Sequence, residues 1–420
     1  EITRLTVLPF QFNRPKHNCQ DNLFILSRII DMCKTTRCPL FLLFTDIKKA
    51  FDSICREFLF KVLQKRCPST LASILIFLHE KAKIVFKNLE TITDSGVLQG
   101  DTLAAILFVC VMDEIMREWT TKKGKNGGIK ILFRKGETLK EFLPHEWQNL
   151  SDIKVLEELI HWLGFADDII FVGATLDDVS ESFKIFKDVC LSVGLEINSS
   201  KCGLMLMEWN EPTPQADRVH ADKHVTIDSH KIPLVSEYLY LGVIISNTGT
   251  FSSHTEERGK KSLGTVLGRI KNVKSWIGKN PSLLLKELNT CFAPCLSWGT
   301  DVITLQKAEV GSLNVVFFSY LRKIFQTKFD EKTKKWAQSN KDLEQMSGLK
   351  PPTETLPLAR LKFFFHTLDK DITYHSDCFL NGKLQTDQSD ILKPDKRILT
   401  FSKLLFDNWK QFGVLDLSRK

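Results

Sequence analysis

Two places where acidic residues follow short apolar runs constrain this chain more than any other feature. Residues 39–44 are apolar and lead to Asp46, and the adjacent pair Asp167 and Asp168 stands just before the apolar residues 169–172. Apolar runs of this length are typical of buried strands. An Asp-Asp pair between two apolar runs predicts a hairpin tip, where the carboxylates leave the core while their neighbours stay in it.

These carboxylates also indicate a chemistry. Two like charges at an apolar strand end raise each other's pKa unless a cation neutralises them. Their hard oxygen atoms suit Mg²⁺, and two divalent ions ~3.5–4 Å apart, bridged by carboxylates, are the apparatus of nucleotidyl transfer. Taken alone, however, an Asp-Asp turn is most often solvated turn chemistry.

Hydrophobic periodicity divides the rest of the chain into helices and short strands. Thr175 and Asp178 have the spacing of a capping box at a helix start. The charged, Gly-containing residues 120–147 predict a loop or a hairpin insertion. We expect domain boundaries near residues 210 and 250. The predicted helices cover residues 21–33, 49–65, 102–119 and 256–277, and a further strand covers residues 238–245.

Composition and charge narrow the class of protein. The 58 Lys and Arg residues against 50 Asp and Glu leave a net charge of +8, which suits a polyanionic partner. The 11 Cys residues are odd in number and scattered, so a reducing, intracellular compartment fits best. The longest apolar stretch, residues 103–112, is shorter than the ~20 residues of a membrane span. The chain begins with Glu1 and no signal-peptide pattern, so we expect a piece of a longer protein.

Five segments, in order along the chain, resemble the motifs of the reverse transcriptase of LINE-type non-LTR retrotransposons. Residues 44–52 (FTDIKKAFD) resemble motif A, and residues 95–108 (SGVLQGDTLAAILF) resemble motif B. Residues 165–168 (FADD) resemble the motif C box, residues 194–201 (GLEINSSK) motif D, and residues 238–242 (YLYLG) motif E, the primer grip. Chance is a poor explanation for five such motifs in order and with sensible spacing.

The resemblance implies an α+β fold: a right-hand polymerase with partial fingers, an antiparallel-sheet palm and a helical thumb. Residues 1–210 would hold the partial fingers and palm, residues 211–250 the end of the palm with the primer grip, and residues 251–420 the thumb and a C-terminal helical nucleic-acid-binding region. The implied function is RNA-templated DNA synthesis with two Mg²⁺ ions (or Mn²⁺), dNTPs, an RNA template and a DNA primer or target. We expect this activity in the nucleus, the cytoplasm or both, and no membrane partner; the oligomeric state is left open.

The resemblance also implies catalytic roles for individual residues. Asp46 and Asp167 would hold the two metal ions, with Asp168 close by and the Ile47 carbonyl as a further ligand. Lys201 would protonate the pyrophosphate leaving group. A solvated surface lysine is nearly as good an interpretation of Lys201.

Three residues would contact the incoming nucleotide. Phe51 would be the steric gate that rejects a ribose 2′-OH, or else a core aromatic residue of the helix expected at 49–65. Gln99 and Gly100 would lie near the nucleotide and template, with Gly100 allowing close backbone approach. The alternative for both is a simple turn at a helix entry.

Other residues would hold the primer and the duplex. Tyr240, Leu241 and Gly242 would position the primer end, or would simply form a buried β-hairpin. A basic face of the helix expected at 256–277, which includes Arg258, would contact the template–primer backbone, although such a face is usually only solvated. A second basic-aromatic stretch, residues 322–336, either binds RNA or is an ordinary amphipathic element. The implied nucleic-acid contacts are Arg14, Lys260, Lys261, Lys271 and Lys274.

The sequence departs from the family pattern at several points. Phe165 replaces the usual Tyr of motif C, and Ala105 stands where motif B usually has Pro. The fingers hairpin that supplies triphosphate-binding residues is expected before residue 1. The alternative functions are therefore a catalytically silent nucleic-acid-binding remnant and a metal-dependent nuclease; an RNA-dependent RNA polymerase is disfavoured by Phe51.

Overall fold

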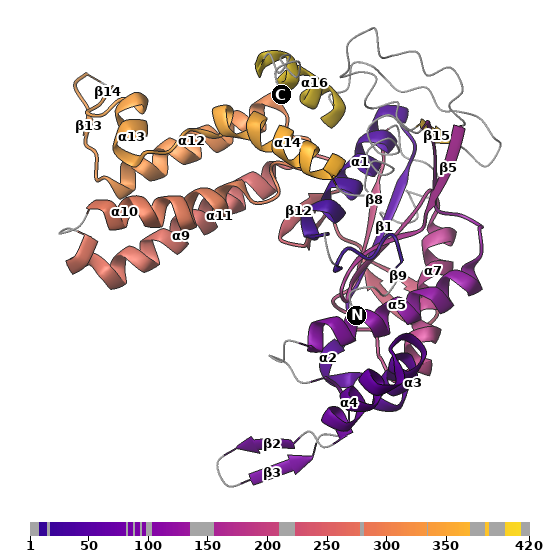
Figure 1. Ribbon diagram of the computed structural model, residues 1–420. Coiled ribbons are helices and arrows are strands. Elements are labelled where there is room, and N and C mark those ends of the chain that lie inside the picture. Colours follow the sequence, from indigo (N-terminus) through magenta and orange to yellow (C-terminus); the bar gives the residue numbers. More distant parts are fainter. Residues whose placement is uncertain are drawn as a thin grey trace.

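The computed structural model forms two lobes, which Figure 1 shows side by side. We call residues 8–246 the sheet lobe and residues 252–369 the helical lobe. The structure describes residues 8–14, 17–80, 83–86, 89–92, 95–97, 103–134, 155–209, 223–277, 281–333, 335–369, 383–385 and 400–412.

A four-stranded antiparallel sheet, in the order β6-β7-β1-β8, is the centre of the sheet lobe. All six residues of β1 are buried, because strands pair with both of its edges and other elements cover both faces. On one face Trp119 stacks on Phe171, and on the other Phe44 stacks on Tyr238 with ring centroids 4.1 Å apart. The strands are β1 (Leu40–Thr45), β6 (Trp162–Phe165), β7 (Asp168–Gly173) and β8 (Gly203–Met207).

Helices pack around this sheet. The first helix, α1 (Cys19–Thr36), begins with a capping box between Asn18 and Asp21. The predicted capping box at Thr175 forms only in part: the Thr175 side chain accepts from the Asp178 amide, but the Asp178 carboxylate binds Lys123 and the Gly128 amide instead. The helices that cover the sheet are α5 (Ala104–Lys123) and α7 (Leu176–Ser192).

Two predicted boundaries in the sheet lobe are wrong. The single helix expected over 49–65 is two helices, α2 (Ala50–Ser53) and α3 (Arg56–Arg66), because Ile54 and Cys55 leave helical geometry to pair with residues 95–97. Gly96 lies so close to Asp52 that an added Cβ would stand 2.7 Å from the Asp52 Cα. The next elements are α4 (Ser69–Glu80), β2 (Lys83–Phe86) and β3 (Leu89–Ile92).

The second difference concerns residues 120–147. Helix α5 continues to Lys123, where the expected loop had begun, and a strand follows it. That strand, β4 (Ile129–Arg134), pairs with β5 (Val155–Ile160) and with β15 (Lys383–Gln385), so the expected hairpin insertion is present in part. Residues 135–154 lie outside the described residues.

The strand predicted over 238–245 is a tight hairpin. Its arms are β11 (Glu237–Tyr240) and β12 (Val243–Ser246), and its turn is Leu241-Gly242. Both turn residues have positive φ, 46° and 80°, as a two-residue hairpin turn of this kind requires. A second hairpin joins β9 (His224–Ile227) and β10 (His230–Pro233).

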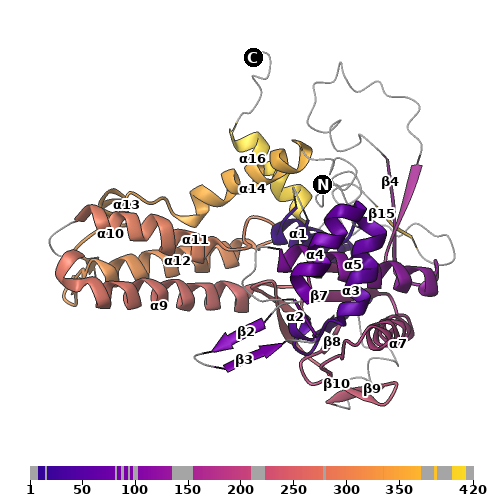
Figure 2. The same cartoon turned by 60° about the horizontal axis from the view of Figure 1, so that its bottom comes forward.

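The helical lobe confirms the predicted amphipathic helix and adds several others. Helix α9 (Ser252–Ile277) runs beside α12 (Lys307–Ile324), as Figure 2 shows. The remaining elements are α10 (Pro281–Glu287), η3 (Leu288–Phe292), α11 (Ala293–Ser297), β13 (Phe329–Asp330), β14 (Lys335–Trp336), α13 (Asn340–Ser347), α14 (Pro352–Asp369) and, beyond the lobe, α16 (Phe401–Phe412). The predicted α+β class with an antiparallel sheet is confirmed. Among the described helices, none combines the length and apolar character that a membrane crossing needs.

Candidate active site

The end of β1 and the β6–β7 hairpin bring the predicted carboxylates together. Phe165 pairs with Asp168 across that hairpin, so the predicted hairpin tip is present, but its turn is Ala166-Asp167 and Asp168 is already the first residue of β7. Strand β1 pairs with β7 in a register that ends with Thr45 opposite Ile169, so Asp46 follows the end of β1 at the edge of the sheet where Asp168 begins β7. The Thr45 hydroxyl donates to the Ile169 carbonyl at 2.9 Å, which fixes this register at the end of the strand.

The three carboxylates repel one another. Burial, together with the charge of Asp46, raises the pKa of Asp167 above its ordinary value. Partial desolvation at the strand end, followed by the negative charges of Asp167 and Asp46, raises the pKa of Asp168 to about 6, although the residue as a whole remains exposed. Among the described basic side chains, none forms an ion pair with any of the three. The cluster is therefore an acidic site whose charge no basic side chain in the described ranges neutralises.

The donor set of this cluster fits a divalent cation. Carboxylate oxygens are the ligands that Mg²⁺ and Mn²⁺ prefer, and a bound cation would offset the mutual repulsion that contributes to the raised pKa of Asp167 and Asp168. In the described part of the chain, no three His, Cys, Asp or Glu side chains are already arranged in ligand geometry. Asp46 and Asp167 are half-buried and Asp168 is exposed, so all three stand at the protein surface.

A cleft of about 520 Å³ joins Asp46 to Lys201. The segment that contains Lys201 is tied to the end of β1: the Asn198 amide donates to the Asp46 carbonyl, and the Lys48 amide donates to the Glu196 carbonyl, both at 2.8 Å. This pairing does not involve the Ile47 carbonyl. Lys201 itself is exposed, and its backbone carbonyl accepts from the Tyr238 hydroxyl at 3.0 Å.

A buried glutamine that the sequence reasoning missed holds the acidic turn. The Gln11 side chain accepts from the Ala166 amide at 3.0 Å and donates to the Ala166 carbonyl at 3.1 Å. Backbone bonds between Gly164 and both Phe10 and Phe12 keep this segment beside the hairpin. A lone Gln in a short polar-apolar stretch carries no sequence signal, so only the tertiary structure reveals it.

The predicted primer-grip residues lie beside this site. The Tyr240 hydroxyl is buried and donates to the Asp168 carbonyl at 3.3 Å, with its ring against Phe44. Leu241 and Gly242 form the hairpin turn, whose carbonyls accept from the Trp298 indole at 3.2 Å and from the Arg258 guanidinium. The hairpin thus links the carboxylates to the helical lobe.

Arg258 corrects one expectation. The sequence places it on the basic face of the helix, but the structure buries it against the Gly242 carbonyl, because α9 packs on the hairpin at this point. Lys260 and Lys261, one turn on, are exposed as predicted. Lys271 and Lys274 belong to α9, but their side chains lie outside the described part of the structure.

The remaining predicted residues have varied settings. Phe51 is half-buried and stacks on Phe108 of α5, with ring centroids 4.3 Å apart. Arg14 is half-buried, donates to the Pro9 carbonyl at 3.1 Å, and has a pKa lowered by burial. Gln99 and Gly100 lie outside the described residues.

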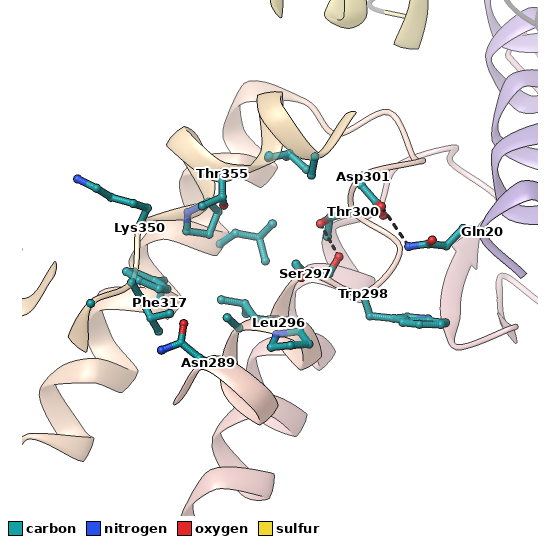
Figure 3. Close-up of a pocket in the computed structure, with 18 residues that line it drawn as sticks. Gln20, Asn289, Leu296, Ser297, Trp298, Thr300, Asp301, Phe317, Lys350 and Thr355 are labelled. Carbon is teal, nitrogen blue, oxygen red and sulfur yellow. Dashed lines mark hydrogen bonds between the residues drawn. The ribbon is translucent and has the colours of Figure 1, made fainter. Parts of the chain in front are cut away.

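A second cavity, of about 550 Å³, lies in the helical lobe and is shown in Figure 3. Trp298 lines it, and Asp301 accepts from the Gln20 side chain at 3.1 Å at its edge. Burial raises the pKa of Asp301 to about 6. No carboxylate of the acidic cluster lines this cavity, so it is separate from the candidate active site.

Comparison with known proteins agrees with the motifs. Residues 6–245, from the Gln11 segment through the primer-grip hairpin, match the family model described as reverse transcriptase (RNA-dependent DNA polymerase). The chain is 24% identical over 240 residues to the Pol polyprotein of a type-1 retrotransposable element R2 of Nasonia vitripennis, a match that covers 54% of this chain and 20% of the relative. It is 23% identical over 244 residues to that of the type-2 element R2DM of Drosophila melanogaster, covering 56% and 20%. The chain thus spans about a fifth of the length of these curated relatives.

Among solved structures, partial matches include telomerases. The chain is 14% identical to apo telomerase from Candida tropicalis, with a TM-score of 0.36 over 81% of this chain and 50% of that one. It is 15% identical to telomerase from Candida albicans in complex with a fragment of telomeric RNA, with a TM-score of 0.32 over 86% and 51%.

The family model covers more than half of the chain and all five motif segments. The predicted resemblance to a non-LTR retrotransposon reverse transcriptase is confirmed by this match and by the two R2 relatives. The α+β architecture, with its antiparallel sheet beside a helical lobe, is that of the polymerase fold that the resemblance predicts. This chain belongs to the reverse transcriptase (RNA-dependent DNA polymerase) family.

Proposed function

We propose that this chain carries out RNA-templated DNA synthesis by two-metal nucleotidyl transfer. The observation that carries the proposal is that the pairing of β1 with β7 brings Asp46, Asp167 and Asp168 to one edge of the sheet, where the charge of Asp46 contributes to the raised pKa of Asp167 and of Asp168. In this proposal the sheet lobe is the palm with part of the fingers, and the helical lobe is the thumb. The partners are an RNA template, a DNA primer or target and dNTPs, in the nucleus or the cytoplasm.

The reaction joins the primer to the nucleotide. The primer O3′ forms a bond to the α-phosphorus of the dNTP, and the bond from that phosphorus to the bridging oxygen of pyrophosphate breaks. Asp46, Asp167, Asp168 and the Ile47 carbonyl would hold two divalent ions. When bound, these ions supply positive charge for the attacking and the leaving oxygens.

Lys201 is the proposed donor of a proton to the pyrophosphate. Its support is the cleft that it shares with Asp46, since a group leaving the acidic cluster through that cleft passes the Lys201 ammonium. Lys49 lines the same cleft and is exposed, so it adds positive charge where the phosphates would lie. An ammonium that donates to a developing pyrophosphate acts as a general acid.

Other residues have proposed positioning roles. Tyr240, Leu241 and Gly242 would hold the primer end, and Phe51 would exclude a 2′-OH, with Gln99 and Gly100 near the nucleotide. The duplex would lie along the helical lobe. Its backbone contacts would be Arg14, Lys260, Lys261, Lys271 and Lys274.

Primer extension on an RNA template with Mg²⁺ tests the proposal. The chain is assayed alone and with a fingers segment fused upstream. Asp167→Asn should abolish extension while leaving binding of the template–primer intact or slightly tighter, because it removes negative charge near phosphate. Asp177→Asn, an exposed Asp of α7, is the matched control and should extend normally. Salt-sensitive binding without extension, even with the fused fingers segment, would reject the polymerase and favour a silent nucleic-acid-binding remnant.

A further inference from the structure

The β13–β14 hairpin presents two aromatic rings to solvent. Phe329 and Trp336 face each other across the two strands, and each side chain is 44% exposed. Their ring centroids are 5.1 Å apart, with the ring planes at 59°. Two exposed aromatic rings held in contact with one another present flat apolar faces on which a ligand can stack.

The hairpin holds these rings in place. At the turn, the Asp330 carboxylate accepts from the Lys332 amide at 2.8 Å and from the Thr333 hydroxyl at 2.8 Å. The Arg322 guanidinium lies 5.1 Å from the centre of the Trp336 ring and donates to the Asn340 side chain at 2.6 Å. Trp336 is therefore fixed through α12 and α13, and the pair of rings is a preorganised platform.

Positive charge surrounds the platform. Lys328, Lys332 and Lys335 are exposed, and none of them forms an ion pair with a described residue. The hairpin contains two acidic residues, Asp330 and Glu331, and Asp330 already accepts the hydrogen bonds of the turn. Residues 327–338 contain no Val, Leu, Ile or Met, so the patch lacks the aliphatic groups of a membrane anchor or an apolar protein interface.

From these contacts we infer that the β13–β14 hairpin binds an unpaired nucleic-acid strand. Phe329 and Trp336 stack on bases, and Lys328, Lys332 and Lys335 contact the phosphates on either side. Rings that stack on any base, with basic side chains along the backbone, are how proteins hold single strands without reading their sequence. The hairpin stands at the end of the helical lobe away from the sheet lobe (Figure 1), so this contact is separate from the proposed catalytic site.

The inference rests on the proposed function, because it names a strand that a polymerase would hold. Its test measures binding and does not require nucleotidyl transfer. Binding is measured by fluorescence anisotropy in EDTA, with labelled oligo-uridine RNA, oligo-thymidine DNA and a blunt duplex. The double variant Phe329→Ala, Trp336→Ala should bind both single strands about tenfold to hundredfold more weakly. Phe365→Ala removes an exposed aromatic residue elsewhere in the helical lobe, 40% exposed, and should change the affinity less than twofold.

Further variants separate stacking from charge. Trp336→Phe should keep most of the affinity, whereas Lys328→Gln, Lys332→Gln and Lys335→Gln together should flatten the dependence of affinity on salt. Loss on RNA but not on DNA would identify RNA as the strand, and the reverse would identify DNA. Ultraviolet crosslinking of 5-iodouridine RNA to the unaltered protein should label the peptide that contains Phe329 or Trp336.

Three results would overturn the inference. The first two are unchanged single-strand affinity in the folded double variant and crosslinks that map entirely elsewhere. Equal losses on the single strands and the blunt duplex would also reject an unpaired strand as the ligand. Primer extension on a short template–primer distinguishes this outcome from failure of the proposed function, because the double variant keeps Asp46, Asp167 and Asp168. If the double variant extends primers and also binds single strands as tightly as the parent, the role of the β13–β14 hairpin is rejected while the proposed polymerase function stands.

Discussion

The side-chain amide of Gln11 forms two hydrogen bonds with the backbone of Ala166, one through its oxygen and one through its nitrogen, although 155 residues separate them in the sequence. Ala166 has φ 56°, a left-handed conformation that costs an alanine free energy. The two hydrogen bonds offset that cost, because they pair the amide and the carbonyl of a buried residue. Since Asp167 is the next residue, Gln11 sets the position of a carboxylate at the centre of the candidate site.

Gln11→Leu should therefore both destabilise the protein and weaken metal binding. It leaves the Ala166 amide and carbonyl unpaired in the core, at a cost of about 2–4 kcal/mol in the free energy of unfolding. Urea unfolding measures the first effect, and titration with Mn²⁺ measures the second. Gln64→Leu changes an exposed glutamine of α3 and should stay within about 0.5 kcal/mol of the parent. A Gln11→Leu protein as stable as the parent would show that the two Gln11–Ala166 hydrogen bonds contribute nothing to the free energy of unfolding.

The pKa of Asp168, raised to about 6, predicts how Mg²⁺ changes stability with pH. Between its ordinary value and about pH 6, the folded state binds more protons at Asp168 than the unfolded state does. The free energy of unfolding therefore falls as the pH rises through this window, and the repulsion is fully present above about pH 6. Because Asp168 is exposed, solvent screens the effect to about 1 kcal/mol or less.

Mg²⁺ should remove that repulsion. We expect the Tm at pH 7.5 to be higher in Mg²⁺ than in EDTA, and this difference to disappear near pH 5. Thermal unfolding in Mg²⁺ and in EDTA measures it. Asp168→Asn should be more stable than the parent in EDTA at pH 7.5 and should gain less from Mg²⁺. A Tm shift from Mg²⁺ that is equal at both pH values would contradict the electrostatic explanation.

The acidic site is the part of the structure that the sequence predicted best. Asp46, Asp167 and Asp168 each border a short apolar run, which places them at strand ends, and the order of the five motif segments distinguishes them from ordinary turn residues. The β6–β7 turn and the β1 strand follow from the same local pattern. Local patterns of apolar and charged residues thus suffice where an element is defined by its own sequence.

Contacts between distant segments were not predictable in this way. The helix expected over 49–65 breaks at Ile54 because Gly96, 42 residues on, donates to the Ile54 carbonyl. Arg258 has the helical position of a solvent-facing residue, but its partner is the Gly242 carbonyl of a hairpin in the other lobe. The helical periodicity of a sequence shows which residues share a face of the helix. It does not show which other segment packs on that face.

Phe51→Ala should separate the two interpretations of Phe51. If Phe51 is the steric gate, the variant in an active protein should incorporate ribonucleotides while its primer affinity is unchanged. Since Phe51 is half-buried and stacks on Phe108, the variant should also lose about 2–4 kcal/mol of stability. Phe58→Ala, at another half-buried phenylalanine, controls for that loss. Discrimination between dNTP and NTP that stays at the parent level would favour a purely structural aromatic residue.

Gly242→Ala should distort the hairpin turn that joins the lobes. Gly242 has φ 80°, and an added Cβ would stand 2.8 Å from the Trp298 Nε1 that binds the Leu241 carbonyl. We expect a loss of about 1–3 kcal/mol in the free energy of unfolding and a larger loss of primer extension. Gly264→Ala, on α9, meets no heavy atom within 4 Å and should stabilise by about 0.5–1 kcal/mol. Similar behaviour of the two variants in thermal unfolding would rule out a strained turn.

His254 should make the junction between the lobes sensitive to acid. Its Nδ1 accepts from the Ile244 amide at 3.3 Å and its Nε2 donates to the Trp298 carbonyl at 3.0 Å, an arrangement that requires the neutral ring. Burial, with a smaller effect from the nearby Arg258 charge, lowers the pKa of His254 to about 4. The unfolded state therefore binds more protons between about pH 6.5 and pH 4. The contribution of neutral His254 to the free energy of unfolding is therefore complete above about pH 6.5. The free energy of unfolding falls by about 3 kcal/mol as the pH drops to 4.

Urea unfolding at a series of pH values checks this dependence, with His254→Gln as the comparison. Glutamine carries a donor and an acceptor but does not titrate, so the variant should be less stable than the parent at pH 7.5 and should lose less stability as the pH falls. Mutation of His366, an exposed histidine of α14, to Gln should leave the slope of the parent unchanged. Equal slopes for the parent and His254→Gln would assign the acid sensitivity to other groups, because the free energy of protonating His254 would then be the same in the folded and unfolded states.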